Sequence, residues 1–385
     1  MTTTPQATKQ HQKHAFLQKP ALGNFGRNEL AILGAPCNII QHLAQDIIKA
    51  LPAYKIGFAD ADHKEKEETT SSSPYISFTN KITHAQVDFA QQPNVMQQRA
   101  LFNDADLVLV NGNHFSAVSQ IVIINDSKPL HKKIDKLTNV RLVLMDDEQA
   151  SLPAYLAEQV PSIKNAPVIS INNTTAIIQF IKTFILQSAP VLNGLVLSGG
   201  ESLRMGMDKG SLQYHNNKSQ REYVYGLLKP FCNEVFISCN ASQQTMVEDE
   251  GLPFITDSFA DLGPVGGILS AFRYNPNAAW LVVACDLPYL TDKSLQYLVD
   301  KRDISKTATA FASEENNNWP EPLIAIWEPR SYSWLLQMMA QGYSCPRKAL
   351  INADVAMLQP QDITELRNVN EYNDYITTYN NLHTS

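Results

Sequence analysis

The chain has 385 residues, of which 44% are apolar and 18% charged, and its formal net charge is −7. This length favours two domains, and the acidic balance argues against nucleic acid as a partner, because phosphate backbones require clustered Lys and Arg. No run of about 18 apolar residues occurs, so the sequence predicts no membrane-spanning segment. Five scattered cysteines, none in a CxxC pair, indicate reduced thiols and a cytoplasmic protein.

The first half of the chain alternates apolar runs with amphipathic segments. Residues 1–27 are polar and mixed, which predicts a flexible tail, and the alternation that follows predicts an α/β domain with a mostly parallel sheet over residues 28–188. The predicted strands are Glu29–Leu33, Tyr54–Ala59, Asp106–Val110, Gln120–Ile124, Val140–Met145 and Pro167–Ile171, and the predicted helices are Ile39–Leu51 and Thr174–Leu186.

The second half repeats this alternation and predicts another α/β domain over residues 189–385, after a short linker near Ser188–Val191. A helix is predicted at Gly266–Tyr274, behind a Gly/Pro loop. The predicted strands are Gly194–Leu197, Glu234–Cys239, Leu252–Thr256, Trp280–Cys285, Thr307–Ala312 and Pro322–Trp327.

The strongest functional motif is LSGGESLRMGMDKG, which begins at Leu197, the last residue of a predicted strand. Gly199 and Gly200 let the backbone approach a ligand closely, and free N–H groups there can bind phosphate oxygens. Arg204 and Lys209 add positive charge in an otherwise acidic chain. The motif is neither a P-loop nor a GxGxxG dinucleotide fingerprint, and the combination predicts a triphosphate site.

Two carboxylates follow later strands of the second half. Asp286 stands in ACDLP at the end of an apolar strand, where α/β proteins bind ligands, and it suits a Mg²⁺ ion that also binds phosphate oxygens. Asp257 ends another strand, and the segment GPVGG after it opens a helix whose first N–H groups, with Gly266 among them, can face a ligand. Taken alone, Asp286 is more simply explained as the cap of the helix near Thr291.

These motifs, in this order, resemble those of the molybdenum cofactor guanylyltransferases. LSGGESLRMGMDKG resembles the family signature LAGGxSxRMGxDKG, DSFADLGPVGG its acidic segment with a GPLAG turn, and ACDLP its magnesium-binding CDxP. WPEPLIAIW resembles the later PLxALY strand, and RNVN with the acidic helix after it resembles the closing NVNTPEE. The resemblance covers residues 193–385 and implies a Rossmann-like nucleotidyltransferase fold. Ser198 departs from the usual Ala, and GPVGG departs from GPLAG.

The resemblance implies roles for individual residues. Catalysis would fall to Arg204, Lys209 and Asp286, with Asp286 as the ligand of Mg²⁺. The family's asparagine after the second strand falls at either Ser238 or Asn240. The residues implied to bind the nucleotide or the pterin are Leu197, Ser198, Gly199, Gly200, Lys209, Ser238, Asn240, Asp257, Gly266, Asn368 and Asn370.

The implied reaction transfers GMP from GTP to molybdopterin and releases pyrophosphate. Further partners would be molybdoenzymes or other cofactor-biosynthesis proteins. Two alternatives keep the fold, namely a cytidylyltransferase acting on the same pterin and a sugar-phosphate nucleotidyltransferase. A third is a non-catalytic carrier of the cofactor, although an intact Lys209 and Asp286 argue against it.

The first half carries GAPCNIIQ from Gly34 to Gln41, at the place where a P-loop would lie. The second glycine, the lysine and the hydroxyl residue of GxxxxGK[ST] are replaced by Ile39, Ile40 and Gln41, so we expect poor triphosphate binding. DADLVLVNGNHF and APVISINNTTAIIQFI resemble segments of the molybdopterin-guanine dinucleotide biosynthesis adaptor GTPases, with Asn111 and Asn113 in place of the family's Glu and Lys. The resemblance implies a degenerate P-loop GTPase-like adaptor domain with a structural or docking role and without GTPase activity.

Overall fold

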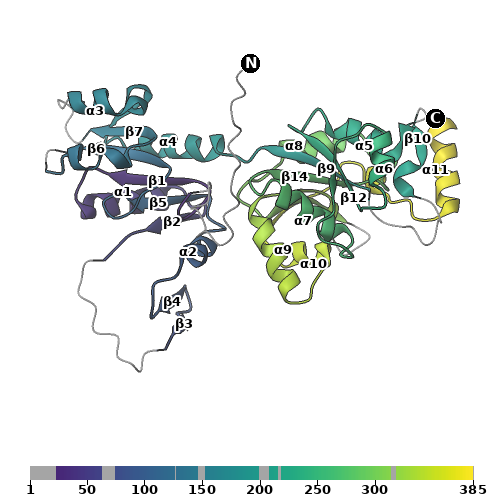
Figure 1. The fold of residues 1–385 in the computed structure, drawn as a ribbon, viewed down its shortest axis with the longest axis horizontal. Helices are drawn as coiled ribbons and strands as arrows, with labels where there is room; N and C mark the ends of the chain where they lie inside the picture. Colours follow the sequence, from purple (N-terminus) through teal and green to yellow (C-terminus); the bar gives the residue numbers. More distant parts are fainter. Residues whose placement is uncertain are drawn as a thin grey trace, which may run out of the picture. The chain divides into compact units, whose positions relative to one another are not determined.

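The computed structural model describes residues 23–62, 74–125, 127–145, 152–198, 208–215, 218–313 and 318–384. The chain divides into two compact units between Ile185 and Leu186 (Figure 1). Strands and helices alternate in each unit, which confirms the predicted α/β class. Within the described ranges, the structure contains no helix with the length and apolar character needed to cross a membrane.

The first unit is built on a six-stranded sheet in the order β2-β5-β1-β6-β7-β8. All pairings in this sheet are parallel, as the alternation of strands and helices predicts. β1 and β7 have the predicted bounds, because each is an uninterrupted apolar run between turn residues. The strands are β1 (Glu29–Leu33), β2 (Ile56–Ala59), β5 (Leu107–Asn111), β6 (Ser119–Ile124), β7 (Val140–Met145) and β8 (Val168–Ser170).

Among the described residues, four α-helices accompany this sheet, and a separate antiparallel hairpin of β3 (Ile76–Asn80) and β4 (Ala85–Phe89) precedes the second of them. The sequence analysis did not predict the hairpin. The helices are α1 (Cys37–Ala50), α2 (Val95–Leu101), α3 (Ala154–Gln159) and α4 (Thr174–Gln187).

The second unit is built on a seven-stranded sheet in the order β13-β12-β9-β14-β16-β15-β17. β16 runs antiparallel to both of its neighbours, and the other pairings are parallel. A small hairpin of β10 (Gln213–His215) and β11 (Lys218–Ser219) lies outside it. The strands are β9 (Leu192–Leu197), β12 (Val235–Cys239), β13 (Phe254–Thr256), β14 (Ala279–Ala284), β15 (Ala308–Ser313), β16 (Trp319–Trp327) and β17 (Val355–Leu358).

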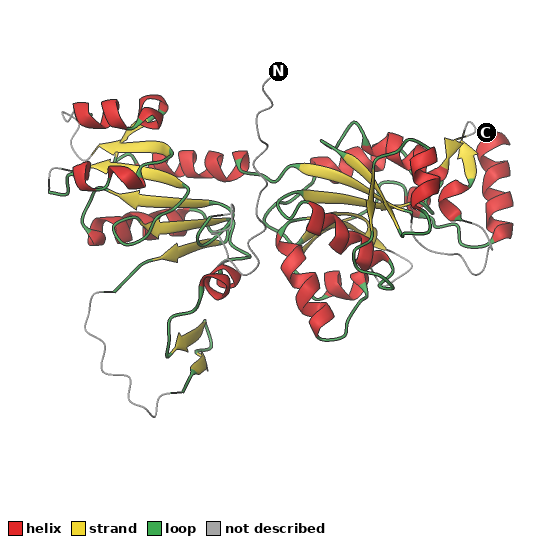
Figure 2. Ribbon diagram, viewed as in Figure 1, coloured by secondary structure: helices red, strands yellow, loops and turns green. Residues whose placement is uncertain are grey.

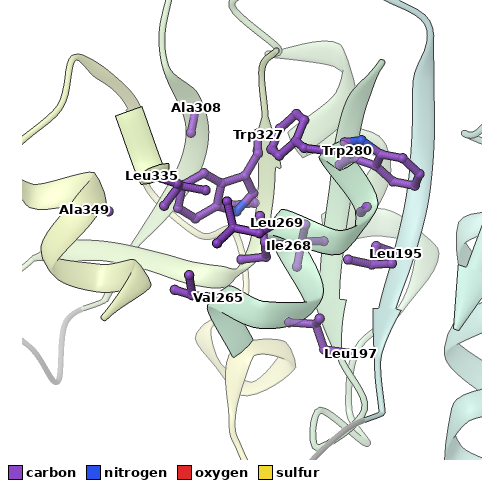
Figure 3. Close-up of a cluster of buried hydrophobic side chains, with 14 of the residues drawn as sticks. Leu195, Leu197, Val265, Ile268, Leu269, Trp280, Ala308, Trp327, Leu335 and Ala349 are labelled. Atoms are coloured by element: carbon purple, nitrogen blue, oxygen red, sulfur yellow. The ribbon is translucent and has the colours of Figure 1, made fainter. Parts of the chain in front are cut away.

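Helices cover both faces of this sheet (Figure 2). One face packs against α7, α9 and α10 around Trp280 and Trp327, both fully buried (Figure 3). The other face packs against α5, α6 and α8. The helices are α5 (Gln220–Leu228), α6 (Gln244–Asp249), α7 (Pro264–Tyr274), α8 (Asp292–Asp300), α9 (Arg330–Ala340), α10 (Pro346–Ile351) and α11 (Tyr372–Thr384).

The register of this sheet aligns the carboxyl ends of its central strands. Leu197, the last residue of β9, pairs with Ser238 of β12 on one side and with Ala284 of β14 on the other. Thr256 of β13 pairs with Cys239. The residues that follow these strands therefore lie along one edge of the sheet, where open α/β sheets bind their ligands.

Candidate active site

A lysine, a carboxylate and an asparagine from distant parts of the sequence meet at this edge. Lys209 Nζ lies 3.6 Å from Asp286 Oδ2 and donates a hydrogen bond to Asn370 Oδ1 at 2.6 Å. The backbone N–H of Val369 donates to the carbonyl of Asp286 at 2.9 Å, which ties the NVN segment to the end of β14. Three of the residues predicted from separate motifs thus form one cluster.

The Asp286 carboxylate is largely buried, and one of its two oxygen atoms accepts no hydrogen bond from the residues that the structure describes. Burial raises the pKa of its carboxyl, and the nearby Lys209 ammonium opposes that shift. Asp286 Oδ1 is buried and has no hydrogen-bond partner among the residues that the structure describes. An orphaned carboxylate oxygen is costly unless a cation or a donor uses it, so this position suits a metal ligand better than a helix cap.

The cap of α8 is a different residue. Thr291 accepts the N–H of Lys293 through its side chain, and Glu365 accepts hydrogen bonds from the Thr291 N–H and hydroxyl at 3.0 and 2.7 Å. Asp286 is therefore left available for another task.

A pocket of about 330 Å³ opens beside the ends of β12 and β13. Ser238 Oγ donates to Asp257 Oδ1 at 2.8 Å inside it, and burial raises the pKa of Asp257 while this hydrogen bond lowers it. The predicted residues Leu197, Ser238, Asn240 and Asp257 all line this pocket. Its dimensions and its carboxylate suit a planar ring that carries N–H donors.

Ser238 and Asn240 differ in what they offer a ligand. Ser238 is buried and bonded to Asp257. Asn240 Oδ1 accepts hydrogen bonds from the N–H groups of Ser242 and Gln243 and from the Ser242 hydroxyl, so it stabilises its own turn. The Asn240 side chain still lines the pocket, and its amide nitrogen is the group it can direct to a ligand.

Gly266 lies in the first turn of α7, which begins at Pro264 and not at Gly266 as predicted. A Cβ at Gly266 would lie 2.4 Å from the carbonyl oxygen of Phe259. This close approach explains why glycine stands where the related turn has alanine. The pocket wall is formed instead by Gly263, Pro264 and Gly267.

A second pocket, of about 520 Å³, lies on the other side of the cluster. Asn368 and Asn370 line it, together with Arg367 and an ion pair in which Arg347 Nη2 lies 2.8 Å from Glu321 Oε2. Glu321 offsets the charge of Arg347, so the Arg367 guanidinium and the two amides are the groups that suit this pocket to a polar, anionic ligand.

The loop predicted to bind phosphate falls in residues 199–207, so Gly199, Gly200 and Arg204 lie outside the described residues. Both ends of the loop are described, and Gln243 Nε2 donates to the Ser198 carbonyl at 3.2 Å and to Asp208 Oδ1 at 3.3 Å. Ser198 itself is buried, and a Cβ at Gly210 would approach its hydroxyl to 2.6 Å. The two ends of the loop are therefore held together by one side chain.

Arg221 supports the same end of the loop. Its side chain is fully buried, forms an ion pair with Asp208, and donates to Ser211 Oγ at 2.7 Å. Glu250 Oε2 lies 3.6 Å from Arg221 Nε. The sequence analysis missed Arg221 and Gln243. One indication was present, because Arg221, Val224 and Leu228 share the buried stripe of α5, where a charged residue is unusual.

Among the described residues, no three His, Cys, Asp or Glu side chains form a ready-made metal-binding group. Mg²⁺ does not need one, because it is often held by one or two carboxylates together with phosphate oxygens and water. The geometry is consistent with the single predicted ligand Asp286.

Comparison with known proteins places this arrangement in a class. Residues 194–355 match the family model of the MobA-like NTP transferase domain. The match spans the strand ends that carry Lys209, Asp257 and Asp286. Fold and site therefore define the second unit as an NTP transferase domain.

Individual relatives indicate a narrower family within the NTP transferases. The molybdenum cofactor biosynthesis bifunctional protein of Synechocystis sp. is 33% identical over 184 residues, which are 48% of this chain and 52% of that protein. A probable molybdenum cofactor guanylyltransferase of Natronomonas pharaonis is 30% identical over 172 residues, which are 43% of this chain and 78% of that protein. The chain thus spans about half the length of the first relative and most of the second.

Among solved structures, the molybdopterin-guanine dinucleotide biosynthesis protein A from Archaeoglobus fulgidus covers 50% of this chain and all of its own, at 21% identity and a TM-score of 0.43. Membership rests on the sequence matches. Through its second unit, the chain belongs to the molybdenum cofactor guanylyltransferase family.

Proposed function

We propose that the second unit transfers GMP from GTP to molybdopterin and releases pyrophosphate. The observation that carries this proposal is the meeting of Lys209, Asp286 and Asn370 between two pockets. One pocket has the features of a base site and the other those of a site for a polar anion. Names of related proteins support the same reaction.

The chemistry needs positioning and charge stabilisation rather than an acid–base pair. The terminal phosphate oxygen of molybdopterin forms a bond to the α-phosphorus of GTP, and the bond from that phosphorus to the bridging oxygen of pyrophosphate breaks. Lys209 lies where it can neutralise charge that develops on the phosphate oxygens. Arg204 is proposed to add a second positive charge from the loop.

Asp286 is the residue that would hold Mg²⁺, since its Oδ1 is buried and has no partner within the described part of the chain. When bound, magnesium would supply a Lewis acid that stabilises negative charge on the phosphate oxygens. Lys209 lies 3.6 Å from the same carboxylate, and its charge lowers the pKa of Asp286 against the larger rise that burial causes.

The base and the pterin would lie on opposite sides of this cluster. An ionised Asp257 can accept the two neighbouring N–H donors of guanine, an arrangement that cytosine does not offer, and Leu197, Ser238 and Asn240 form the surrounding wall. Asn368 and Asn370 would contact the pterin from the larger pocket.

The test measures pyrophosphate release by the purified full chain with magnesium and molybdopterin, supplied in parallel with GTP, CTP or ATP. Release with GTP alone supports the proposal. Release with CTP moves the protein to the cytidylyl branch, and release only with a sugar phosphate as acceptor changes the substrate class. Pterin binding without release from any nucleotide would indicate a carrier.

For the first unit, we propose a degenerate P-loop-like domain that docks partner proteins and does not hydrolyse GTP. Support comes from the all-parallel sheet and from Gly34, which connects β1 to α1 with a φ of +97°. Where a P-loop has its lysine, Ile40 is fully buried. GTP hydrolysis to GDP by the full chain carrying Asp286→Asn would overturn this proposal.

A further inference from the structure

A thiol and an imidazole are in contact at the carboxyl edge of the first unit's sheet. Cys37 is the first residue of α1, and His114 follows β5. Cys37 Sγ lies 3.3 Å from His114 Nε2. Both side chains are partly exposed, so a small molecule can reach them.

A carboxylate that two side-chain amides hold in place lies beside the imidazole. Asp60 Oδ1 lies 4.0 Å from His114 Nε2, and the same carboxylate accepts hydrogen bonds from Gln41 Nε2 and Asn111 Nδ2, each at 2.7 Å. Asp60 follows β2, so three strand ends converge on the pair. Asp60 therefore faces the same imidazole nitrogen, Nε2, that contacts Cys37 Sγ.

The surroundings of the thiol are electropositive. The Asn113 amide lies 3.5 Å from Cys37 Sγ, and its oxygen accepts a hydrogen bond from Lys133 Nζ at 2.6 Å. Burial, followed by the charges of Lys136 and Lys128, lowers the pKa of Lys133. The amino terminus of α1 adds the positive end of its dipole. An amide, a lysine ammonium and a helix amino terminus therefore lie around the thiol.

The other cysteines lack this setting. Burial raises the pKa of Cys232 and of Cys285 to about 12, and that of Cys239 to about 11. Cys345 is exposed, and it gives an internal reference for a thiol that is accessible in the same chain.

We propose that Cys37 is a nucleophilic thiol that forms a reversible mixed disulfide with small carboxylate-bearing disulfides, and that His114 is its base. His114 Nε2 takes the thiol proton as Cys37 Sγ attacks one sulfur of the disulfide. A new S–S bond forms, the old one breaks, and the departing thiolate takes the proton back from the imidazolium. One protein thiol and one disulfide become one mixed disulfide and one free thiol. Lys133 attracts the carboxylates of the reagent.

The test treats the full-length reduced chain with oxidised glutathione and follows each cysteine by peptide mass spectrometry. We expect Cys37 to be modified roughly tenfold faster than Cys345, and His114→Gln to slow Cys37 roughly tenfold without affecting Cys345. Lys133→Gln should slow the reaction of Cys37 with oxidised glutathione but not its reaction with the neutral disulfide dithiodipyridine.

Equal rates at Cys37 and Cys345 in the wild-type chain would overturn the proposal without any variant. So would an unchanged Cys37 rate in a His114→Gln protein whose circular dichroism matches wild type. Cys37→Ser serves as the mapping control, since it must remove the fast-reacting peptide and leave the others. If Cys37 in Lys133→Gln reacts with oxidised glutathione as fast as in the wild-type chain, Lys133 does not attract the carboxylates of the reagent.

Discussion

In both units a buried central strand, β1 or β9, ends at small residues on the carboxyl edge of its sheet, and the units differ in the residues that follow that strand. In the first unit, Gly34 leads within three residues into α1, and Ile40 points into the core. In the second unit, β9 is followed by a long glycine-rich segment that ends at Lys209, which reaches Asp286. The comparison teaches that similar strand ends can be followed by very different residues, the buried Ile40 in one unit and the Lys209–Asp286 pair in the other.

The largest effect should come from removing the carboxylate of Asp286. Asp286→Asn keeps the size of the side chain but loses the charge that pairs with Lys209 and would hold magnesium, so pyrophosphate release should fall roughly 10²–10³-fold. Asp60→Asn is the matched control in the first unit, because Asp60 also follows a strand at the sheet edge, and it should leave release unchanged. Equal losses in the two variants would mean that the edges do not differ in function.

Much of the fold could be predicted because the central strands are apolar runs between turn residues. β1 and β7 have their predicted bounds, and β14 differs by one residue at each end. The β3–β4 hairpin was missed because most of its residues are exposed, so no core face appears in its pattern. The antiparallel direction of β16 was missed because an apolar run carries no information on strand direction.

The site residues also fall into a group that the sequence could predict and a group that it could not. Lys209, Asp257 and Asp286 stand in motifs directly after strands, so sequence spacing alone placed them at one edge. Arg221 and Gln243 belong to no motif, and their role depends on which residue they face after folding, namely Asp208 in both instances. Ser238, and not Asn240, bonds to Asp257, a distinction that only the register of β12 and β13 reveals.

The next largest effect should come from Ile40→Lys, which tests how the first unit differs from a P-loop that binds GTP. Ile40→Lys places a lysine where that motif has one, but the position is fully buried. We expect the free energy of unfolding to fall by about 3 kcal/mol or more, because an unpaired charge would enter the core, with no gain in GTP binding. Asn38→Lys, at an exposed position of the same helix, should have little effect on chemical denaturation. Tight GTP binding by Ile40→Lys would show that this segment can hold phosphates as a P-loop does.

Replacing each of two glycines by alanine should mainly lower stability in one variant and mainly weaken GTP binding in the other. A Cβ at Gly34 would lie 2.1 Å from the backbone oxygen of Ile123, and the residue has a φ of +97°, so Gly34→Ala should cost about 2 kcal/mol or more of stability. A Cβ at Gly267 would lie 2.4 Å from Ser238 Oγ, a group that can rotate. Gly267→Ala should therefore change stability less and raise the KM for GTP. Thermal melts and steady-state kinetics of both variants give the comparison, and the reverse pattern would contradict it.

The smallest effect concerns pH and tests whether the ionised Asp257 holds the base. Burial raises the pKa of Asp257, and the hydrogen bond from Ser238 lowers it, so Ser238→Ala should raise that pKa further. Because the ionised form exists only above the pKa, acidification should raise the KM for GTP, and in Ser238→Ala this rise should begin at a higher pH. At neutral pH the loss of the hydroxyl should raise KM roughly 2–10-fold.

Ser242→Ala is the matched control, since its hydroxyl bonds to Asn240 and not to Asp257. If the KM profile moves with Ser242→Ala instead, the base is recognised through Asn240. If neither variant moves the profile while kcat also stays constant, the carboxylate does not contact the nucleotide. The second unit would then hold a carboxylate that accepts a hydrogen bond from its own unit without contacting the nucleotide, much as Asp60 accepts hydrogen bonds from Gln41 and Asn111.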